Sequence, residues 1–543
     1  MPKWIFVTGG VMSGLGKGIV AASMAKLLTM TGLKVSAAKI DPYLNVDAGT
    51  LNPIAHGEVF VCNDGSECDM DLGNYERFLD KPLARYHNIT SGQVYSQVIK
   101  DERKGKYLGQ CVQIIPHLTN EIKRRIRLVA EMDNADCVVI ECGGTVGDIE
   151  SLPFLEALRQ MRLEEGPSNT LFVHVTLVPA LDVVGEQKTK PTQHSVQELR
   201  RIGIQPDVIV ARSEKPLTKE AKSKIALFSS VDLKSVISNP DVESIYSVPE
   251  NLASEGIVST ICEKLQLSNK EIHWGEWKKI SESFIGNKEE VRIAMVGKYT
   301  ALTDSYVSIN HALAHAGAQL GLKVKVGWME AECFENQEES CKELEKYHGV
   351  LIPGGFGKRG SEGKIIVANY CREKGIPYLG LCFGFQLALA SFARYACGLE
   401  NANSTELDPN TPHPVIDLLP EQRDIKDLGA TMRLGSHEIN LIEGTLAFRL
   451  YQRKVIMERH RHRYEFNQNY REIFERNGMV FSGFSDEGKR VEIMEIPNHP
   501  FYLATQYHAE FISRPGKAEP VFLGLLEASL KRKYATHAIT AHV

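Results

Sequence analysis

Residues 7–20 read VTGGVMSGLGKGIV, an apolar strand followed by a glycine-rich turn, a lysine and the start of a helix. This order is typical of a phosphate-binding loop, in which backbone N–H groups, a helix N-terminus and one lysine hold the phosphates. The usual form is G-x-x-x-x-G-K-[ST], but Val11 stands at its first glycine and Gly18 replaces the Ser or Thr that holds Mg²⁺. The stretch therefore predicts a nucleotide site whose metal ligands come from elsewhere. The alternative is a tight strand-to-helix turn in which the glycines serve packing alone.

Strands and helices alternate on both sides of the chain's midpoint. The first half repeats a short β-branched run, a turn and a helical pattern, in WIFVTGG, VSAAKID, DCVVIECGG, LFVHVTLVP and DVIVAR. A second series follows in VRIAMVG, LKVKVGWM, GVLIPGG, IPYLGLC and LATQYH. Such alternation predicts an α/β protein with parallel sheets flanked by helices.

The length of 543 residues predicts more than one domain. We expect a first domain over residues 1–267, a polar linker over 268–290, a second domain over 291–530 and a short frayed tail over 531–543. The net charge of −5, with acids and bases interspersed, argues against a nucleic-acid or polybasic membrane partner.

The cysteine pattern bears on the compartment. The eleven cysteines include no CxxC pair, so we expect reduced thiols rather than a disulfide framework or a zinc ribbon. The N-terminus shows no signal-peptide pattern, and no apolar run approaches the length of a membrane span. These features together predict a soluble cytoplasmic protein.

Acidic residues near strand ends are the candidate metal ligands. The run CVVIE ends in Glu141, CDMDLGNYERF offers Asp69 and Asp71, and KIDPYLNVDAGT offers Lys39 and Asp41. In open α/β sheets, ligands bind at the carboxyl ends of the strands. Mg²⁺ takes one or two carboxylates together with phosphate oxygens and water. We predict Mg²⁺ at Asp71 and Glu141; the alternative is that these acids cap helices.

A lysine pair precedes a helix in GEQKTKPTQHSVQEL. Lys188 and Lys190 flank Thr189, and together they can clamp a second polyphosphate. Taken alone, the pattern favours a solvated charge cluster at a helix start.

A second constellation lies in the C-terminal half. The stretch IPYLGLCFGFQLALASFA places Cys382 between Gly380 and Gly384 at a strand–turn–helix, the thiol counterpart of the nucleophile elbow G-x-S-x-G. A helix N-terminus favours the reactive thiolate. ATQYHAEF supplies His508 and Glu510, so the order Cys…His-x-Glu predicts a hydrolytic triad.

Two further stretches support this site. The glycine turn in LIPGGFGKRG can offer a backbone oxyanion donor at Gly355. Most buried cysteines are inert packing residues, but the elbow, the turn and the His-x-Glu pair together favour catalysis at Cys382. The run RHRHRY at residues 459–464 can be a metal site, a basic patch or an arginine contact to a substrate carboxylate. We favour the arginine contact, because the planar guanidinium suits a carboxylate.

The Cys, His and Glu set is that of class I glutamine amidotransferases, which release ammonia from glutamine. Joined to a P-loop synthetase, it resembles the CTP synthase family from the first strand to about residue 525. The segments that carry the resemblance are VTGGVMSGLGKG, KIDPYLNVDAGT, HGEVFV, DLGNYERF, GGTVGDIES, GEQKTKPTQHSV, PGGFGKRG, ENANSTE, DLGATMRLG and RHRHRYE. The resemblance implies a dethiobiotin-synthetase-like P-loop domain followed by a flavodoxin-like amidotransferase domain.

The resemblance also implies a reaction. ATP phosphorylates the 4-oxygen of UTP, Cys382 hydrolyses glutamine through a thioester, and internally transferred ammonia displaces the phosphate to give CTP, in de novo pyrimidine biosynthesis. It implies Mg²⁺ as cofactor, GTP as activator, CTP as feedback inhibitor and a homotetramer. We expect glutamine hydrolysis to be slow until the nucleotides are bound.

Site residues follow from the same resemblance. The implied ATP contacts are Ser13, Gly14, Leu15, Gly16, Lys17, Gly18, Ile19, Lys39, Asp71, Pro240, Asp241 and Val242. Those for UTP or CTP are Ser13, Asp148, Ile149, Glu150, Lys188, Thr189, Lys190, Pro191, Thr192, Gln193 and Lys224. Those for glutamine are Gly355, Phe383, Gly384, Phe385, Gln386, Glu406 and Arg463. The implied ammonia passage is formed by Pro53, His56 and Val59.

One position departs from the family pattern. Ala509 stands where the family commonly has proline between the histidine and the glutamate. Proline would fix φ at about −65°, so Ala509 relaxes the backbone, and we expect activity to survive.

Two other functions compete with this interpretation. A cobyrinic-acid-type amide synthase also joins a P-loop ligase to a glutaminase, but it would not need the lysine pair at 188 and 190. A P-loop switch ATPase with a non-catalytic second domain conflicts with the intact Cys382, His508 and Glu510 set.

Overall fold

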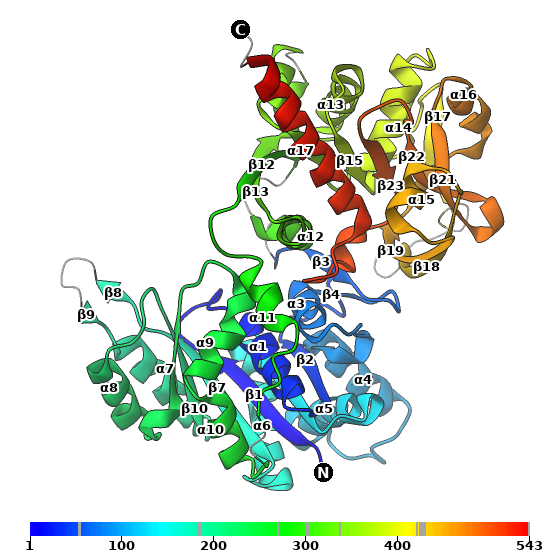
Figure 1. Cartoon of the computed structure of the whole chain (residues 1–543). Coiled ribbons are helices and arrows are strands. Elements are labelled where there is room, and N and C mark those ends of the chain that lie inside the picture. Colours follow the sequence, from blue (N-terminus) through cyan, green and yellow to red (C-terminus); the bar gives the residue numbers. More distant parts are fainter. Residues whose placement is uncertain are drawn as a thin grey trace. The chain divides into compact units, whose positions relative to one another are not determined.

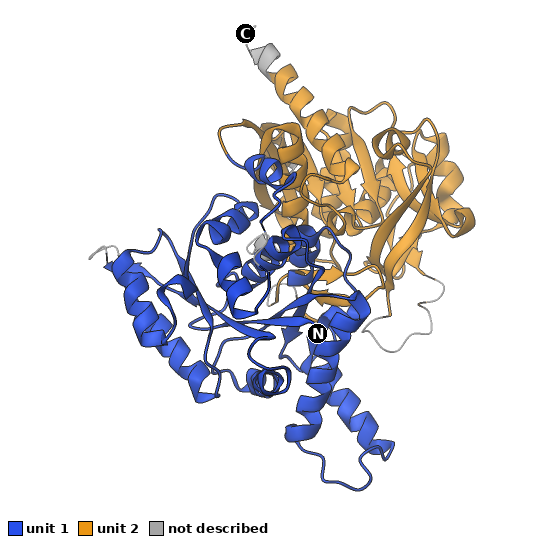
Figure 2. Ribbon diagram, turned by 60° about the horizontal axis from the view of Figure 1, so that its bottom comes forward, with its two compact units in different colours: residues 1–48, 71–285 blue, residues 49–70, 286–543 orange. Residues whose placement is uncertain are grey.

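The computed structural model describes residues 1–52, 56–181, 186–268, 271–298, 303–335, 338–419, 422 and 431–540. The chain divides into two compact units (Figure 2). Unit 1 comprises Met1–Ala48 and Asp71–Ile285, and unit 2 comprises Gly49–Met70 and Gly286–Val543. A segment from the N-terminal part of the sequence therefore folds with the C-terminal unit.

Unit 1 is built on a seven-stranded sheet in the order β11-β10-β7-β1-β6-β2-β5 (Figure 1). All its paired strands run parallel. The strands are β1 (Lys3–Gly9), β2 (Val35–Asp41), β5 (Asn88–Thr90), β6 (Cys137–Cys142), β7 (Thr170–Leu177), β10 (Val208–Ser213) and β11 (Val236–Pro240). β2 is buried at every position, so both of its faces are covered, as a parallel sheet requires.

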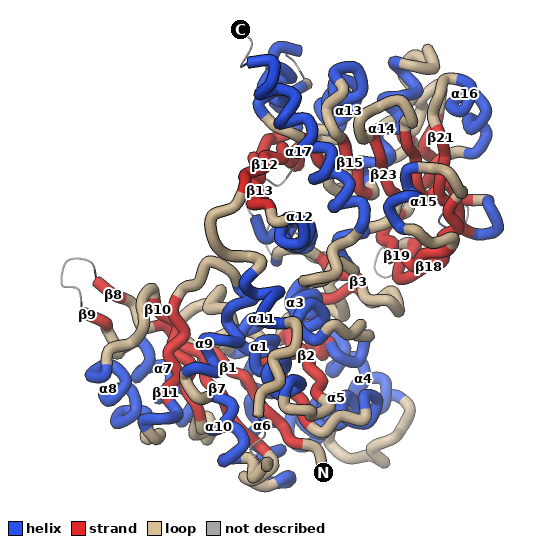
Figure 3. Tube along the Cα trace, viewed as in Figure 1, coloured by secondary structure: helices blue, strands red, loops and turns tan. Residues whose placement is uncertain are grey.

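Helices and one small hairpin complete unit 1 (Figure 3). The helices are α1 (Lys17–Met30), α3 (Met70–Leu79), α4 (Ser91–Arg103), α5 (Thr119–Asp133), α6 (Leu152–Glu165), α7 (Lys190–Arg201), α8 (Lys219–Ser229), α9 (Val248–Ser254), α10 (Ile257–Lys264) and α11 (Trp277–Glu282). The hairpin pairs β8 (Ala180–Leu181) with β9 (Glu186–Gln187). The stretch expected as a linker thus contains α11, where Trp277 is buried against Phe78, with ring centroids 5.5 Å apart.

Unit 2 contains a nine-stranded sheet in the order β13-β12-β14-β15-β23-β22-β21-β18-β19. The first five strands run parallel, and the remaining pairs are antiparallel. The strands are β12 (Glu289–Gly297), β13 (Leu322–Glu330), β14 (Gly349–Ile352), β15 (Tyr378–Leu381), β18 (Arg433–Leu441), β19 (Val455–His462), β21 (Val480–Ser485), β22 (Arg490–Glu495) and β23 (Tyr502–Thr505). Both strand series predicted from the sequence are therefore present, and the α/β fold class is confirmed.

The other elements of unit 2 surround this sheet. Its helices are α12 (Val307–Leu320), α13 (Ser361–Lys374), α14 (Phe383–Tyr395), α15 (Leu446–Tyr451), α16 (Arg471–Arg476) and α17 (Pro520–Thr540). A small sheet joins β16 (Asn403–Ser404), β17 (Pro414–Leu418) and β20 (Tyr464–Phe466). A hairpin pairs β3 (Val59–Val61) with β4 (Glu67–Asp69).

The C-terminal end differs from the frayed tail that the sequence predicts from residue 531. Helix α17 continues to Thr540. Glu289 at the start of β12 anchors this helix. The Glu289 carboxylate pairs with Lys533 Nζ at 2.9 Å and accepts a hydrogen bond from the Tyr534 hydroxyl at 2.6 Å. Among the described residues, no helix is both long and apolar enough to cross a membrane.

Two candidate functional sites

The glycine-rich loop joins β1 to α1 at the carboxyl edge of the unit 1 sheet. β1 lies between β6 and β7, which makes this edge the topological switch point where open α/β sheets bind ligands. Gly14 and Gly16 have φ values of 75° and 78°, a conformation that favours glycine. Leu15 between them is buried, whereas Ser13 is exposed. The loop is thus anchored by one apolar side chain and open to a ligand on its outer side.

Lys17 reaches back over the loop. Its Nζ donates to the carbonyl oxygen of Gly144 at 2.6 Å. A Cβ on Gly9 would stand 2.4 Å from Lys17 Cδ, so the glycine makes room for the lysine stem. Burial lowers the pKa of Lys17. Lys17 therefore joins the loop to the segment that leads into Asp148.

The charged residues predicted for the metal and phosphates converge. Lys39 Nζ lies 2.9 Å from Glu141 Oε1 and forms an ion pair with Asp71. Glu141 also accepts a hydrogen bond from the Tyr75 hydroxyl, and Asp71 accepts one from Asn74 at 3.2 Å. Because both carboxylates are directed at one cation, the donor set fits Mg²⁺ with phosphate oxygens.

The two carboxylates differ electrostatically. Burial, reinforced by the charge of Asp71, raises the pKa of Glu141. Burial acts on Asp71 in the same direction, but the charge and hydrogen bond of Lys39 hold its pKa below the ordinary value. A second cation at this position would favour the ionised form of Glu141.

The predicted UTP contacts come from two helices and a turn. Lys188 Nζ pairs with Glu186 at 2.6 Å, and its hydrogen bond and charge, together with the charge of Lys224, lower the pKa of Glu186. The charges of both lysines therefore act on Glu186, although Lys188 and Lys224 lie far apart in the sequence. Thr189 is the N-cap residue just before α7 and accepts a hydrogen bond from Gln193 at 3.0 Å.

A buried chain ties α7 to the phosphate loop. Thr8 at the end of β1 lies 2.9 Å from His174 Nδ1, and His174 Nε2 lies 2.6 Å from the Ser195 hydroxyl. Burial lowers the pKa of His174 to about 3, so the ring is neutral. This chain fixes α7, with Thr192 and Gln193 buried and Lys190 exposed, beside β1.

The other predicted nucleotide contacts lie after β6 and β11. The Asp148 carboxylate accepts a backbone N–H at 2.6 Å, and Ile149 is 80% exposed. Pro240 is the last residue of β11, Asp241 and Val242 follow it, and Asp241 pairs with Arg212 at 2.8 Å. Ile149 thus leaves an apolar side chain open beside the loop that contacts Lys17.

In unit 2, Cys382 occupies a strained elbow between β15 and α14. Its φ is 50° and its ψ is −98°, a costly conformation for a residue with a side chain. Flanking glycines permit the sharp turn, because a Cβ on Gly384 would stand 2.2 Å from the Ile352 carbonyl oxygen. A Cβ on Gly380 would likewise stand 2.9 Å from the Gly384 backbone.

His508 and Glu510 stand beside this elbow. His508 Nδ1 lies 2.7 Å from Glu510 Oε1. A Cβ on Gly354 would be 3.1 Å from His508 Cε1 and 3.8 Å from Cys382 Cβ, so Gly354 packs against both. Burial works to lower the pKa of His508, but the charges of Glu510 and Cys382 raise it to about 10. The imidazole and the Cys382 side chain therefore lie beside the same glycine.

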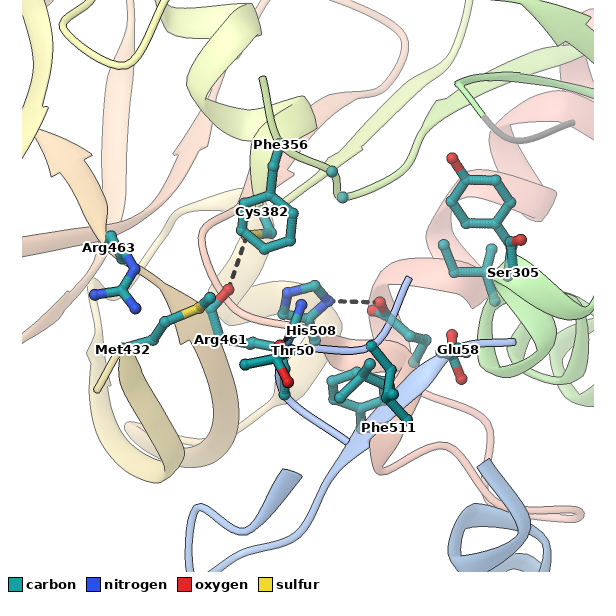
Figure 4. A pocket seen from close by; sticks show the side chains of 18 residues that line it. Thr50, Glu58, Ser305, Phe356, Cys382, Met432, Arg461, Arg463, His508 and Phe511 are labelled. Atoms are coloured by element: carbon teal, nitrogen blue, oxygen red, sulfur yellow. Dashed lines mark hydrogen bonds and ion pairs between the residues drawn. The ribbon is translucent and has the colours of Figure 1, made fainter. Parts of the chain in front are cut away.

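Polar groups also hold the sulfur. The Cys382 thiol donates to the Arg461 carbonyl oxygen at 3.6 Å, and Gln506 Nε2 donates to the sulfur at 3.7 Å. Figure 4 marks the thiol contact and the His508–Glu510 bond with dashed lines. Arg461 lies in the run at 459–464 that the sequence marked, although Arg463 was the arginine named there, and Gln506 was not predicted.

A cavity of about 500 Å³ opens at this sulfur within unit 2 (Figure 4). The predicted residues that line it are Val59, Gly355, Cys382, Arg463, His508 and Glu510. Lining residues that the sequence did not predict include Thr50, Glu58, Phe356 and Met432, and Arg461 of the marked run at 459–464 also lines the cavity. The cavity is large enough for an amino acid.

Other predicted glutamine contacts do not line this cavity. Phe385 is fully buried in the core, and Gln386 donates to the Tyr464 carbonyl oxygen at 2.8 Å. Glu406 accepts the N–H of Gly357 at 2.7 Å, beside the cavity loop. Glu406 thus fixes the turn that carries the lining residues Gly355 and Phe356.

The predicted ammonia passage is placed only in part. Pro53 lies outside the described residues. Val59 lines the cavity, and the exposed His56 is not among the described residues that line it.

Two lysines that the sequence did not mark support the glycine turn. Lys298 donates to the Phe356 carbonyl oxygen at 2.7 Å, and Lys364 donates to that of Pro353 at 3.3 Å. Burial lowers the pKa of Lys298 to about 8 and that of Lys364 well below its usual value. Both lysine side chains thus hold carbonyl oxygens of the segment that contains the glycine turn, and they fix its backbone.

The run at 459–464 forms no metal site. Across the described parts of the chain, no group of three or more His, Cys, Asp or Glu side chains could hold a metal ion. His460 Nδ1 lies 3.1 Å from His462 Nε2, and both rings are buried. Arg463 instead faces the cavity and donates to Gln422 at 2.7 Å.

The chain is similar to known proteins in both of its halves. A family model described as CTP synthase N-terminus matches residues 3–267, and one described as glutamine amidotransferase class-I matches residues 301–528. CTP synthase of Thermococcus kodakarensis is 56% identical over 537 residues, 99% of this chain and 100% of the relative. CTP synthase of Bacillus subtilis is 51% identical over 532 residues, 98% of this chain and 99% of the relative. The acivicin-bound glutaminase domain of Trypanosoma brucei CTPS is 35% identical, with a TM-score of 0.42, over 44% of this chain and 94% of that one.

Proposed function

The chain belongs to the CTP synthase family, and on that premise we propose that its two units divide the chemistry of making CTP from UTP, ATP and glutamine. The enzyme is a glutamine-hydrolysing ligase of pyrimidine nucleotide synthesis. Unit 1 activates UTP, and unit 2 supplies the ammonia. The observation that carries the second assignment is the Cys382 elbow with the His508–Glu510 pair at one cavity.

Unit 1 transfers a phosphoryl group from ATP to the 4-oxygen of UTP. The glycine-rich loop and Lys17 bind the ATP phosphates, while Lys188 and Lys224 bind those of UTP. Asp71 and Glu141 would hold Mg²⁺, which would neutralise charge on the transferring phosphoryl group. Ammonia then adds at C4 of the pyrimidine, and phosphate leaves.

Unit 2 hydrolyses the γ-amide of glutamine. The Cys382 thiolate attacks the carbonyl carbon, and backbone N–H groups of the turn at Gly355 stabilise the oxyanion. Protonated His508 gives its proton to the departing ammonia, and Glu510 holds the ring in place. His508 then removes a proton from water, which cleaves the thioester and releases glutamate.

Binding partners follow from the same proposal. GTP activates glutamine hydrolysis, CTP inhibits by occupying the UTP site, and the active form is a cytoplasmic homotetramer. Light scattering with and without ATP and UTP measures the assembly. An activator of unit 2 should raise the rate with glutamine and leave the rate with ammonium unchanged.

The first experiment measures CTP formation from UTP and Mg-ATP, with either ammonium chloride or glutamine, for the wild type and Cys382→Ala. We expect the variant to make CTP from ammonium but not from glutamine. If the variant still uses glutamine, Cys382 is not the nucleophile. If the wild type hydrolyses glutamine but makes no CTP from either source, the acceptor is not UTP.

A further inference from the structure

The β3–β4 hairpin lies within the sequence matched by the synthetase model, yet it folds with unit 2. The chain leaves unit 1 after Ala48 and returns at Asp71, the proposed metal ligand. The hairpin therefore comes from the synthetase part of the sequence and packs on the glutaminase. Its contacts there show what it can do.

One strand of unit 2 contacts both members of the catalytic pair through its backbone. In β19, the carbonyl oxygen of Arg459 accepts the His508 N–H at 2.8 Å. The carbonyl oxygen of Arg461, two residues on, accepts from the Cys382 thiol at 3.6 Å. The position of this strand therefore sets the position of both catalytic side chains.

The side chains of Arg459 and Arg461 bind the hairpin through hydrogen bonds and an ion pair. Arg461 Nε pairs with Glu67 Oε1 at 2.8 Å, and the Glu67 side chain is 1% exposed. Arg459 donates to Asn63 Oδ1 at 2.6 Å and to the Val61 carbonyl oxygen at 2.9 Å. Each arginine thus contacts the hairpin through its side chain and a catalytic residue through its backbone carbonyl oxygen.

An aromatic contact supports His508 from the same hairpin. The Phe511 ring stacks on His508 with centroids 5.0 Å apart and planes 18° apart. Phe60 of β3 meets Phe511 edge-on at 5.2 Å and lies under the Arg459 guanidinium at 5.3 Å. The hairpin is consequently connected to His508 through Arg459 and through Phe511. It is connected to Cys382 through Arg461.

We propose that the β3–β4 hairpin is the positioning element of the glutaminase, acting through Arg459, Arg461 and Phe511. This inference rests on the proposed roles of Cys382 and His508. The hairpin and its arginine partners hold the sulfur and the imidazole in attack geometry. Because the hairpin returns to unit 1 at Asp71, four residues beyond Glu67, events at the nucleotide site have a covalent path to the glutaminase.

The test removes a hairpin contact that touches neither catalytic residue. Glu67→Ala leaves Arg461 without its carboxylate, and we expect kcat for glutamine hydrolysis to fall about 10- to 100-fold, because small displacements of reacting groups cost this much. KM for glutamine should stay within about threefold, and CTP formation from ammonium within about twofold. Glu67→Gln keeps an acceptor oxygen, so its kcat for glutamine hydrolysis should lie between that of the wild type and that of Glu67→Ala. A merely structural role of Glu67 would not lower kcat while leaving KM for glutamine and the ammonium-dependent activity nearly unchanged.

The control breaks another arginine–glutamate ion pair of unit 2, in which the glutamate side chain is 45% exposed. Glu362→Gln removes the partner of Arg394, now 2.6 Å away, on the helix that follows Cys382, and we expect wild-type kinetics. If Glu67→Ala lowers the melting temperature or the ammonium activity, Phe60→Leu and Glu67→Gln decide the question. Wild-type kcat in both would overturn the proposal. Cys382→Ala, assayed alongside, tests the nucleophile separately, so failure of one proposal is distinguishable from failure of the other.

Discussion

Gly18 lies against Asp71 so closely that a Cβ on Gly18 would stand 2.1 Å from Asp71 Oδ1. Gly18 is the second residue of α1 and occupies the position where the usual phosphate loop has Ser or Thr. The carboxylate of Asp71 fills the space that such a side chain would need. The carboxylate that we propose as a metal ligand therefore occupies the place of the usual hydroxyl, and only glycine at position 18 leaves room for it.

Restoring the usual motif should therefore abolish the synthetase. We expect Gly18→Ser to lower CTP formation from ammonium by at least about 100-fold, because displacing Asp71 misplaces the transferring phosphoryl group. Gly18→Ala is the matched comparison, since it adds the Cβ without the hydroxyl. Equal losses show a steric cause, whereas better activity in the serine variant would mean that the hydroxyl takes over the metal. Glutamine hydrolysis should persist in both variants.

The raised pKa of His508 predicts an alkaline limit for glutamine hydrolysis. With a pKa of about 10, the imidazole keeps the proton that it gives to ammonia up to that pH. We expect kcat/KM to fall as pH rises through about 10. Because the folded pKa exceeds the unfolded value of about 6.5, the stability that the ring contributes is complete below pH 6.5 and is lost on the same alkaline limb.

The Glu510 charge raises the His508 pKa against the effect of burial. Glu510→Gln should accordingly move the alkaline limb to lower pH and reduce kcat. The pH–rate profile of wild type and variant measures the shift. An unmoved limb in the variant would assign the pKa to another group.

Lys298 offers a test of the glycine turn. Its ammonium donates to the carbonyl oxygens of Phe356 and Gly357. We expect Lys298→Met to lower kcat for glutamine hydrolysis about 10-fold or more, because the N–H groups of the turn lose their fixed direction. The exposed Lys358 of the same turn provides the control, and Lys358→Met should behave as wild type. An equal loss in the two variants would point to lost charge rather than lost orientation.

Local patterns predicted much of this molecule. The apolar runs of β1 and β6 and the glycines around Cys382 act on their own neighbours, so sequence alone indicates the strands and the elbow. The Arg461–Glu67 pair spans 394 residues and the Lys39–Glu141 pair spans 102, and no local pattern encodes such contacts. For the same reason the sequence could not assign residues 49–70 to unit 2.

Ala509 tests whether the departure from the family pattern matters. It is buried at the first position of a short 3₁₀ helix (Ala509–Phe511), a position that tolerates proline. His508 before it has φ −105° and ψ 81°, outside the α region that a following proline disfavours. We therefore expect Ala509→Pro to keep glutaminase activity within about threefold and to stabilise the fold by about 0.4–1 kcal/mol, because proline restricts the unfolded chain. Ala509→Gly should act in the opposite direction on the melting temperature. A tenfold loss of activity in the proline variant would mean that the His508–Glu510 bond depends on the alanine backbone.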